Sequence, residues 1–345
     1  MSSQFRIRKP WKWVAALACA ALAMAAATTT ALAQPPQEGS GDLEVIQVRP
    51  NLYMIAGAGG NIAVQIGPIG VVLINSGREE MADKVLAVVK KLTDLPIRYI
   101  INTSGDADDV GGNAKLSKAG RTILQGAVGQ SGVTEEVINN GGAASVLAHE
   151  NVLLRMSAPT GKVSPFPEDD WPTKTYAFQK GYAMALNGEG IIVKHMPNAH
   201  SDGDSLVLFR HADVIVTGDV YDNTRFPVID VEKGGSIQGE IAALNTLLDL
   251  TIPPVPFPWE EGRTLLIPGH GRIADDSDLV EYRDMITIIR DNVQDYIKSG
   301  LTLDQIKKAD PAKAYRPRYG ADTGSWTTDM FIEAIYKDLT ERKGK

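Results

Sequence analysis

Cysteine is nearly absent from this chain, whose 345 residues contain only Cys19. That cysteine lies in an N-terminal segment that has four basic residues, an alanine-rich apolar stretch from Val14 to Ala27, and the triplet Ala31-Leu32-Ala33. This order is typical of a secretory signal peptide, here residues 1–33. We expect cleavage after Ala33. The mature chain would then have no disulfide, no thiolate metal ligand and no cysteine nucleophile.

A long apolar run is also missing. The stretch from Val14 to Ala27 is shorter than the ~20 residues that span a bilayer, which disfavours an uncleaved N-terminal anchor. We therefore expect a periplasmic or secreted protein with no stable membrane anchor after cleavage. The sequence leaves the oligomeric state open.

Basic residues are in the minority. Without the four in the expected signal peptide, 31 basic residues face 42 acidic ones, which gives a net charge of −11. Non-specific binding to nucleic acid needs a basic surface. The composition therefore argues against a nucleic-acid partner.

No linker separates residues 43–300, which we predict to form one domain with two β-sheets and helices outside them. Residues 34–42 are rich in Pro, Gly and Ser and predict a flexible mature N-terminus. Residues 301–345 predict a helical C-terminal extension. Hydrophobic periodicity and turn residues predict the elements inside the domain. They are antiparallel strands in 43–76, a helix at 79–94, a strand at 96–104, a helix at 145–157, strands at 188–210, 213–219 and 264–271, and helices at 236–250 and 278–300.

Histidine is missing from a loop that otherwise has the frame of a metal site. The stretch YIINTSGDADDVGGN, Tyr99 to Asn113, combines an apolar strand, a turn dense in carboxylates and a Gly-Gly-Asn exit. Three later strand-end turns also carry polar residues, namely His200 to Asp204, Gly218-Asp219 and Gly269-His270-Gly271. Each turn is a weak signal alone. Together they could bring ligands from distant parts of the sequence to one point.

The order of these turns resembles the metallo-β-lactamase superfamily. "NTSGDADDVGGN" is similar to its signature loop, N-T-H-x-H-x-D-H-x-G-G-N, and "PNAHSDGDSLVLF" to its third-histidine motif. "VIVTGDVYDNTRFPVID" resembles the strand with the metal-bridging aspartate, and "LLIPGHG" resembles the last histidine motif. The likeness covers Leu43 to Ile297. It implies an α+β fold, a four-layer αββα sandwich, and a metallohydrolase that acts on a small-molecule substrate.

Four functional residues of the family match this chain residue by residue. Asp108 matches the aspartate of the signature loop, His200 the third-motif histidine, Asp219 the bridging aspartate and His270 the final histidine. The three histidines of the signature loop are absent. Their positions hold Ser104, Asp106 and Asp109, and Asn75 stands where many relatives have an aspartate.

The altered set changes the expected chemistry. Asp106, Asp108, Asp109 and Asp219, if brought together, would repel one another unless a cation or protons lay among them. Such an oxygen-rich set with two imidazoles suits Mn, Fe(II), Mg or Ca at least as well as Zn. We expect a divalent cation, Zn, Mn or Fe, as one ion rather than two. Its ligands would come from Asp108, Asp109, His200, Asp219 and His270.

Asp108 and Asp106 are the candidate catalytic residues of a hydrolase for an ester, lactone, amide or phosphoester bond. Asp106 would accept a proton as general base. Two alternatives stay open. The chain could be an inactive family member that binds a small molecule or a partner, or the acidic pocket could hold a structural cation only. The aspartates could also cap the helix that follows them. The other histidines are predicted to be structural, although His149 could line the pocket.

Overall fold

The computed structural model describes residues 43–123, 142–159, 161–177, 181–253 and 262–341. The expected signal peptide and flexible N-terminus lie outside these residues. No helix within the described ranges is long and apolar enough to cross a membrane.

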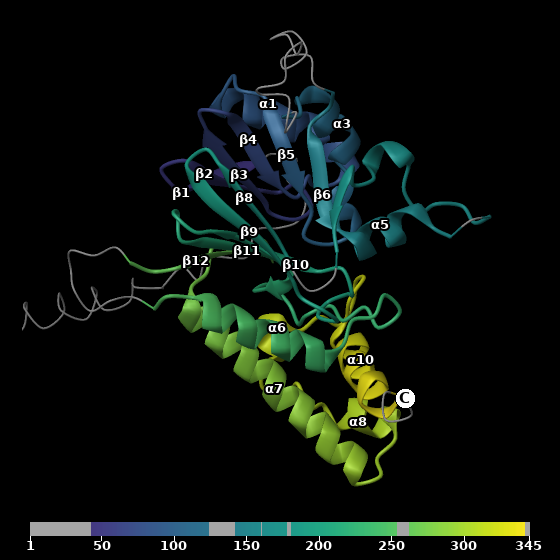
Figure 1. The fold of residues 1–345 in the computed structure, drawn as a ribbon. Helices are drawn as coiled ribbons and strands as arrows, with labels where there is room; N and C mark the ends of the chain where they lie inside the picture. Colours follow the sequence, from purple (N-terminus) through teal and green to yellow (C-terminus); the bar gives the residue numbers. More distant parts are fainter. Residues whose placement is uncertain (1–42, 124–141, 160, 178–180, 254–261, 342–345) are drawn as a thin grey trace, which may run out of the picture. The chain divides into compact units, whose positions relative to one another are not determined.

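Two β-sheets form the centre of the fold (Figure 1). The first contains β1 (Glu44–Arg49), β2 (Leu52–Ala56), β3 (Ile62–Gly67), β4 (Gly70–Ile74), β5 (Ile97–Ile101), β6 (Ser145–His149) and β7 (Lys174–Tyr176), in that spatial order. The second has the order β12-β11-β10-β9-β8, with β8 (Tyr182–Leu186), β9 (Glu189–His195), β10 (Ser205–Phe209), β11 (Val214–Asp222) and β12 (Leu265–His270). The predicted antiparallel meander is confirmed for β1 to β4. Strands β4 to β7 are parallel, as are β11 and β12.

Helices cover the outer face of each sheet (Figure 1). The strands of the first sheet are connected by α1 (Ala82–Leu92), α2 (Ala107–Val110), α3 (Asn113–Ala119) and α5 (Glu150–Ser157), with the short 3-10 turns η1 (Glu79–Met81) and η2 (Glu168–Asp170). The second sheet is covered by α6 (Ile237–Leu250) and α7 (Asp276–Lys298), and the chain ends in α8 (Leu303–Ala309), α9 (Arg316–Tyr319) and α10 (Thr328–Glu341).

Alternation of side chains along the strands produces separate apolar layers. In β4, Val71 and Leu73 pack with α1 on the outer face, while Val72 and Ile74 face the second sheet. A strand that is buried on both faces in this way reads as a continuous apolar run. A third layer lies between the second sheet and the helices α6, α7, α8 and α10. The order of layers is therefore helix, sheet, sheet, helix.

Two sequence-based boundaries are wrong. Residues 145–157 are not one helix, because 145–149 form strand β6, which pairs with β5 and β7, and only Glu150–Ser157 are helical. The strand expected to end at Asp219 continues to Asp222, with irregular pairing to β12 around Gly218. The helices predicted at 79–94, 236–250 and 278–300 are confirmed, as are those of the C-terminal extension.

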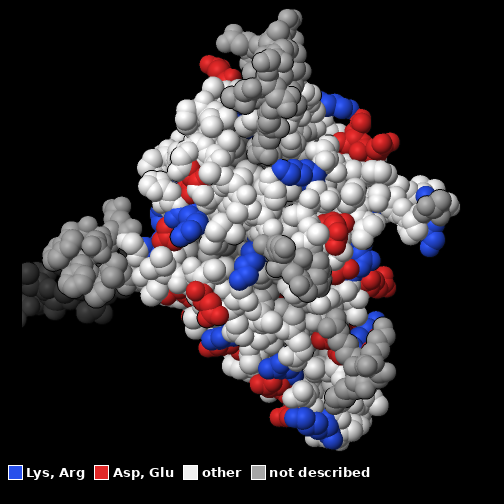
Figure 2. Space-filling model, viewed as in Figure 1, with Lys and Arg blue, Asp and Glu red and all other residues white. Residues whose placement is uncertain are grey.

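The face shown in Figure 2 carries Lys and Arg interspersed with Asp and Glu. Mixed charges of this kind keep like charges apart on the surface.

Candidate functional site

The carboxylate-rich turn is fixed to its neighbours by buried amide groups. Asn75 has the left-handed conformation, with φ of 66°, and its side-chain oxygen accepts a hydrogen bond from the Thr103 backbone N–H at 2.8 Å. Asn102 Nδ2 donates to the Asp109 carbonyl at 3.0 Å and to Asn113 Oδ1 at 3.1 Å. These hydrogen bonds fix the backbone at both ends of the turn. The fixed backbone then determines where the side chains between the two ends point.

Asp109 points into the protein from this turn. Thr103 Oγ1 and Ser104 Oγ donate to Asp109 Oδ2 at 3.0 and 2.8 Å, and the residue is 2% exposed. Burial, with the charges of Asp219 and Asp108, raises the pKa of Asp109 well above its usual range. Of the six candidate residues, Asp109 is the one that does not line the pocket described below.

His200 is oriented by a carboxylate on its own loop. Its Nδ1 lies 3.4 Å from Asp204 Oδ1, and Asp204 is itself held by the Ser201 N–H at 2.6 Å and the Ser201 hydroxyl at 2.8 Å. Its Nε2 lies 3.4 Å from Asp106 Oδ2. Burial alone would lower the pKa of His200, but Asp204, Asp219 and Asp106 raise it well above its usual value.

Asp219 follows a glycine that no other residue could replace without strain. Gly218 has φ of +52°, and a Cβ there would lie 2.3 Å from Thr103 Oγ1. Ser104 Oγ, whose single O–H is shared with Asp109, also lies within hydrogen-bond distance of Asp219 Oδ2, at 3.1 Å. Burial, together with the charges of Asp106 and Asp108, raises the pKa of Asp219 to about 6, although His200 and His270 oppose this rise.

His270 lies at the end of β12 between two carboxylates. Its Nε2 is 3.3 Å from Asp108 Oδ2 and 3.8 Å from Asp219 Oδ1. Burial would lower the pKa of His270, but Asp108, Asp219 and Asp222 raise it to about 9. Burial would raise the pKa of Asp108, but the hydrogen bond and the charge of His270 lower it to about 2.

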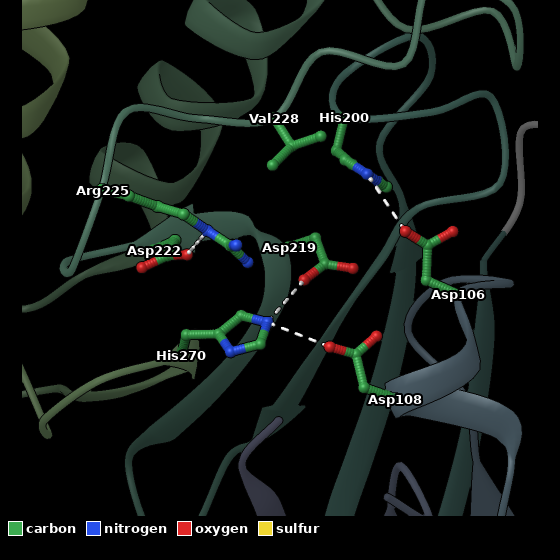
Figure 3. A pocket seen from close by; sticks show the side chains of 8 residues that line it. All are labelled: Asp106, Asp108, His200, Asp219, Asp222, Arg225, Val228 and His270. Atoms are coloured by element: carbon green, nitrogen blue, oxygen red, sulfur yellow. Dashed lines mark hydrogen bonds and ion pairs between the residues drawn. The ribbon is translucent and has the colours of Figure 1, made fainter. Parts of the chain in front are cut away.

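These side chains surround one small pocket (Figure 3). Its volume is about 50 Å³, and it is lined by Asp106, Asp108, His200, Asp219, Asp222, Arg225, Val228 and His270. Five of the six candidate residues therefore meet in one place. A pocket of this size has room for an ion with water, but not for a substrate of ~300 Å³ or more. A substrate would have to lie across its opening.

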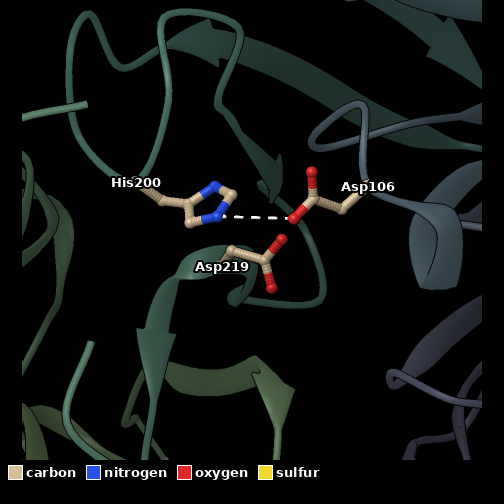
Figure 4. A group of neighbouring side chains, drawn as sticks. All are labelled: Asp106, His200 and Asp219. Carbon is tan, nitrogen blue, oxygen red and sulfur yellow. Dashed lines mark ion pairs between the residues drawn. The ribbon is translucent and has the colours of Figure 1, made fainter. Parts of the chain in front are cut away.

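The donor atoms fit a divalent cation. Asp106, His200 and Asp219 each place one such atom within 4.8 Å of the other two, the one such group among the described residues (Figure 4). Asp108, Asp219 and His270 form a looser second group, in which His270 Nε2 lies 3.3 Å from Asp108 and 3.8 Å from Asp219 but the three donor atoms do not all meet the 4.8 Å spacing. Two ligands ~2.1 Å from one tetrahedral ion lie roughly 3.4 Å apart, which matches the His200–Asp106 and His270–Asp108 separations of 3.4 and 3.3 Å. The same separations are long for a charged hydrogen bond.

Two cationic side chains at the pocket were not predicted from the sequence. Arg225 Nε donates to Asp222 Oδ2 at 2.6 Å, and the rest of its guanidinium points toward Asp219 (Figure 3). Lys233 Nζ lies 2.9 Å from Asp106 Oδ1. Both residues come from the loop after β11. Arg225 lies within the stretch VIVTGDVYDNTRFPVID but matches no functional residue of the resemblance, and no periodicity or motif distinguishes Lys233 from a surface residue. His149 does not line the pocket.

No protein-family model matches the sequence, and neither does any curated protein. Among solved structures, the chain is similar to a metallo-β-lactamase from Pontibacter korlensis, with a TM-score of 0.50 and 17% identity over 71% of this chain and 99% of that one. It is also similar to the stereoselective inverting sec-alkylsulfatase Pisa1 from Pseudomonas sp., with a TM-score of 0.57 and 14% identity over 86% of this chain and 50% of that one. At these identities the likeness concerns the fold. The expected architecture is confirmed: the chain has the metallo-β-lactamase fold, an αββα sandwich with a helical C-terminal extension.

Proposed function

We propose that this protein is an exported, metal-dependent hydrolase that cleaves an ester, lactone, amide or phosphoester bond of a small molecule. The observation that supports this most directly is the convergence of Asp106, Asp108, His200, Asp219 and His270 on one pocket at the strand ends of this fold. Asp219 lies between the two histidines and belongs to both candidate donor groups. A divalent cation bound there would polarise the scissile bond and lower the pKa of a water molecule.

The protein's own residues have distinct parts in this proposal. Asp204 orients His200 through Nδ1, so that Nε2 faces the pocket. The Ser104 hydroxyl lies between Asp109 and Asp219 and connects Asp219 to the buried turn. Asp106 Oδ2, which faces His200 Nε2 at 3.4 Å, is the oxygen that would accept a proton from water, since Oδ1 is bonded to Lys233 at 2.9 Å. Arg225 offers guanidinium N–H groups on the Asp219 side of the pocket (Figure 3), where they would stabilise negative charge on a substrate bound there.

Metal analysis of the purified protein tests the cation. We expect near-stoichiometric Mn, Zn or Fe(II) in the wild type, and loss of that metal in Asp219→Asn, because both donor groups need this carboxylate. Asp295→Asn is the matched control, since Asp295 is an exposed aspartate on α7 whose ion pair with Lys298 lies outside the pocket. Absence of metal from the wild type, even after incubation with all three ions, would sink the proposal.

A panel of esters, lactones, amides, phosphoesters and sulfate esters tests the reaction. Sulfate esters belong in it because one structural neighbour is an alkylsulfatase. Turnover that disappears in Asp219→Asn but persists in Asp295→Asn supports a hydrolase.

A binding protein without catalysis, or one with a structural cation only, is the second candidate function. One observation favours it: Lys233, Arg225 and the two histidines pair with the pocket carboxylates and so neutralise part of their negative charge. Stoichiometric metal without turnover of any compound in the panel would select this candidate.

A further inference from the structure

Lys233 is held against the pocket by a turn that is bonded to the His200 loop. The backbone N–H of Asp230 donates to the His200 carbonyl at 2.9 Å, and the N–H of Asp202 donates to the Lys233 carbonyl at 3.0 Å. The Lys233 N–H donates to Asp230 Oδ1 at 2.9 Å. The backbone of Lys233 is therefore fixed relative to His200.

The ammonium group of Lys233 lies between two carboxylates. Its Nζ is 2.9 Å from Asp106 Oδ1 and 3.0 Å from Asp230 Oδ2. The other oxygen of Asp106, Oδ2, faces His200 Nε2 at 3.4 Å. A cation that used Asp106 Oδ2 as a ligand would therefore lie only ~5 Å from a fixed positive charge, where repulsion is strong even in a partly hydrated site.

The two donor groups of the pocket differ in their contact with Lys233. Spacing alone favours Asp106, His200 and Asp219, whose donor atoms all lie within 4.8 Å of one another. In the second group, Asp108 and Asp219 have ion pairs with His270 and none with Lys233, whose carboxylate partners are Asp106 and Asp230. Arg225 points toward Asp219, which both groups share, but its own ion pair is with Asp222 (Figure 3). Spacing thus favours Asp106, His200 and Asp219 as ligands, whereas charge favours Asp108, Asp219 and His270. We expect charge to determine where the cation binds, because side chains can shift by a few tenths of an ångström whereas the lysine stays charged at neutral pH.

We propose that Lys233 neutralises Asp106 and thereby limits the pocket to one divalent cation, bound by Asp108, Asp219 and His270. This inference rests on the proposed function, since it presupposes a cation site. It assigns Lys233 as a positioning residue that sets the number and place of the ions.

The number of bound ions tests the inference. Wild type and Lys233→Met are loaded with Mn or Zn, dialysed, and compared by elemental analysis and calorimetric titration with the same metal. We expect one ion in the wild type. In Lys233→Met we expect a second ion, or first-ion binding at least about tenfold tighter, because a repelling charge is gone. Lys233→Arg should resemble the wild type. Lys118→Met, which removes a lysine paired with Asp169 outside the pocket, is the matched control.

A pair of isosteric variants tests the place of the ion. Asp106→Asn should keep the metal and Asp108→Asn should lose it, with folding checked by circular dichroism. The reverse result, two ions in the wild type, or an unchanged Lys233→Met would overturn the inference while leaving the metal-dependent hydrolase intact. If the wild type binds no cation, the proposed function fails. The inference then fails with it, because it expects one ion in the wild type.

Discussion

At the scale of single residues, Gly218 is the position where backbone and side-chain limits coincide. It precedes Asp219, has φ of +52°, and leaves no room for a Cβ beside Thr103, 2.3 Å away. We expect Gly218→Ala to lower the free energy of unfolding by roughly 1–3 kcal/mol. Because Gly218 directly precedes the proposed ligand Asp219, the variant should weaken metal binding as well. Urea denaturation and metal titration measure the two effects.

The control for this substitution is Gly188→Ala. Gly188 has a similar φ of +75°, but a Cβ there would meet nothing within 4 Å. It should cost only the backbone strain, ~1 kcal/mol. An equal loss of stability in the two variants would contradict a clash at Thr103.

The sequence identified most of the pocket because its signals are local. Asp108 and His200 follow a strand, and Asp219 and His270 lie near the end of one, each next to a recognisable turn. The sequence did not show that Asp109 points into the protein and away from the pocket. That direction depends on hydrogen bonds from the Thr103 and Ser104 hydroxyls to its carboxylate. The contact between Lys233 and Asp106 spans 127 positions, and a lysine in a loop gives no signal of such a contact.

At the scale of elements, strand β6 and helix α5 show where periodicity fails. Residues 145–157 have apolar positions at helical spacing, yet 145–149 are a strand because β5 and β7 lie on either side of them. A short buried apolar run cannot be assigned from periodicity alone. His149 marks the change, since its Nδ1 accepts the Asn151 N–H at 3.2 Å and so caps α5.

This cap predicts a pH dependence. Burial and the neighbouring His195, whose ring stacks at 3.8 Å, lower the pKa of His149 to about 4. The unfolded chain, with a His pKa of ~6.5, binds the proton first as pH falls. This contribution to stability is therefore present above pH ~6.5 and is lost between ~6.5 and ~4, by at most ~1.4 kcal/mol per pH unit.

Urea denaturation across that pH range measures the effect. His149→Gln should remove this part of the slope, because glutamine can accept the same N–H without titrating. His211→Gln, at an exposed turn position, should leave the slope as in the wild type. If both variants retain the wild-type slope, His149 is not its source.

At the scale of the whole molecule, the layered order of the fold was predictable and its long-range packing was not. The meander, the strand-end turns and the outer helices follow from patterns within a few residues. The aromatic cluster that connects the C-terminal helices to the pocket loop does not. Phe331 on α10 stacks on Phe226 at 5.0 Å and 8°, and the Phe226 N–H donates to the Tyr319 carbonyl at 3.1 Å. Phe226 directly follows Arg225 in sequence.

The extension should therefore unfold together with the sheets. Phe331 is fully buried, so we expect Phe331→Ala to lower the free energy of unfolding by about 3–5 kcal/mol in one transition. The transition should have the same midpoint by far-ultraviolet circular dichroism and by tryptophan fluorescence. Met330→Ala, at the neighbouring residue that is 41% exposed, should change stability by no more than ~0.5 kcal/mol. An earlier, separate transition in Phe331→Ala would instead mean that α8 to α10 fold independently and give the pocket loop no support.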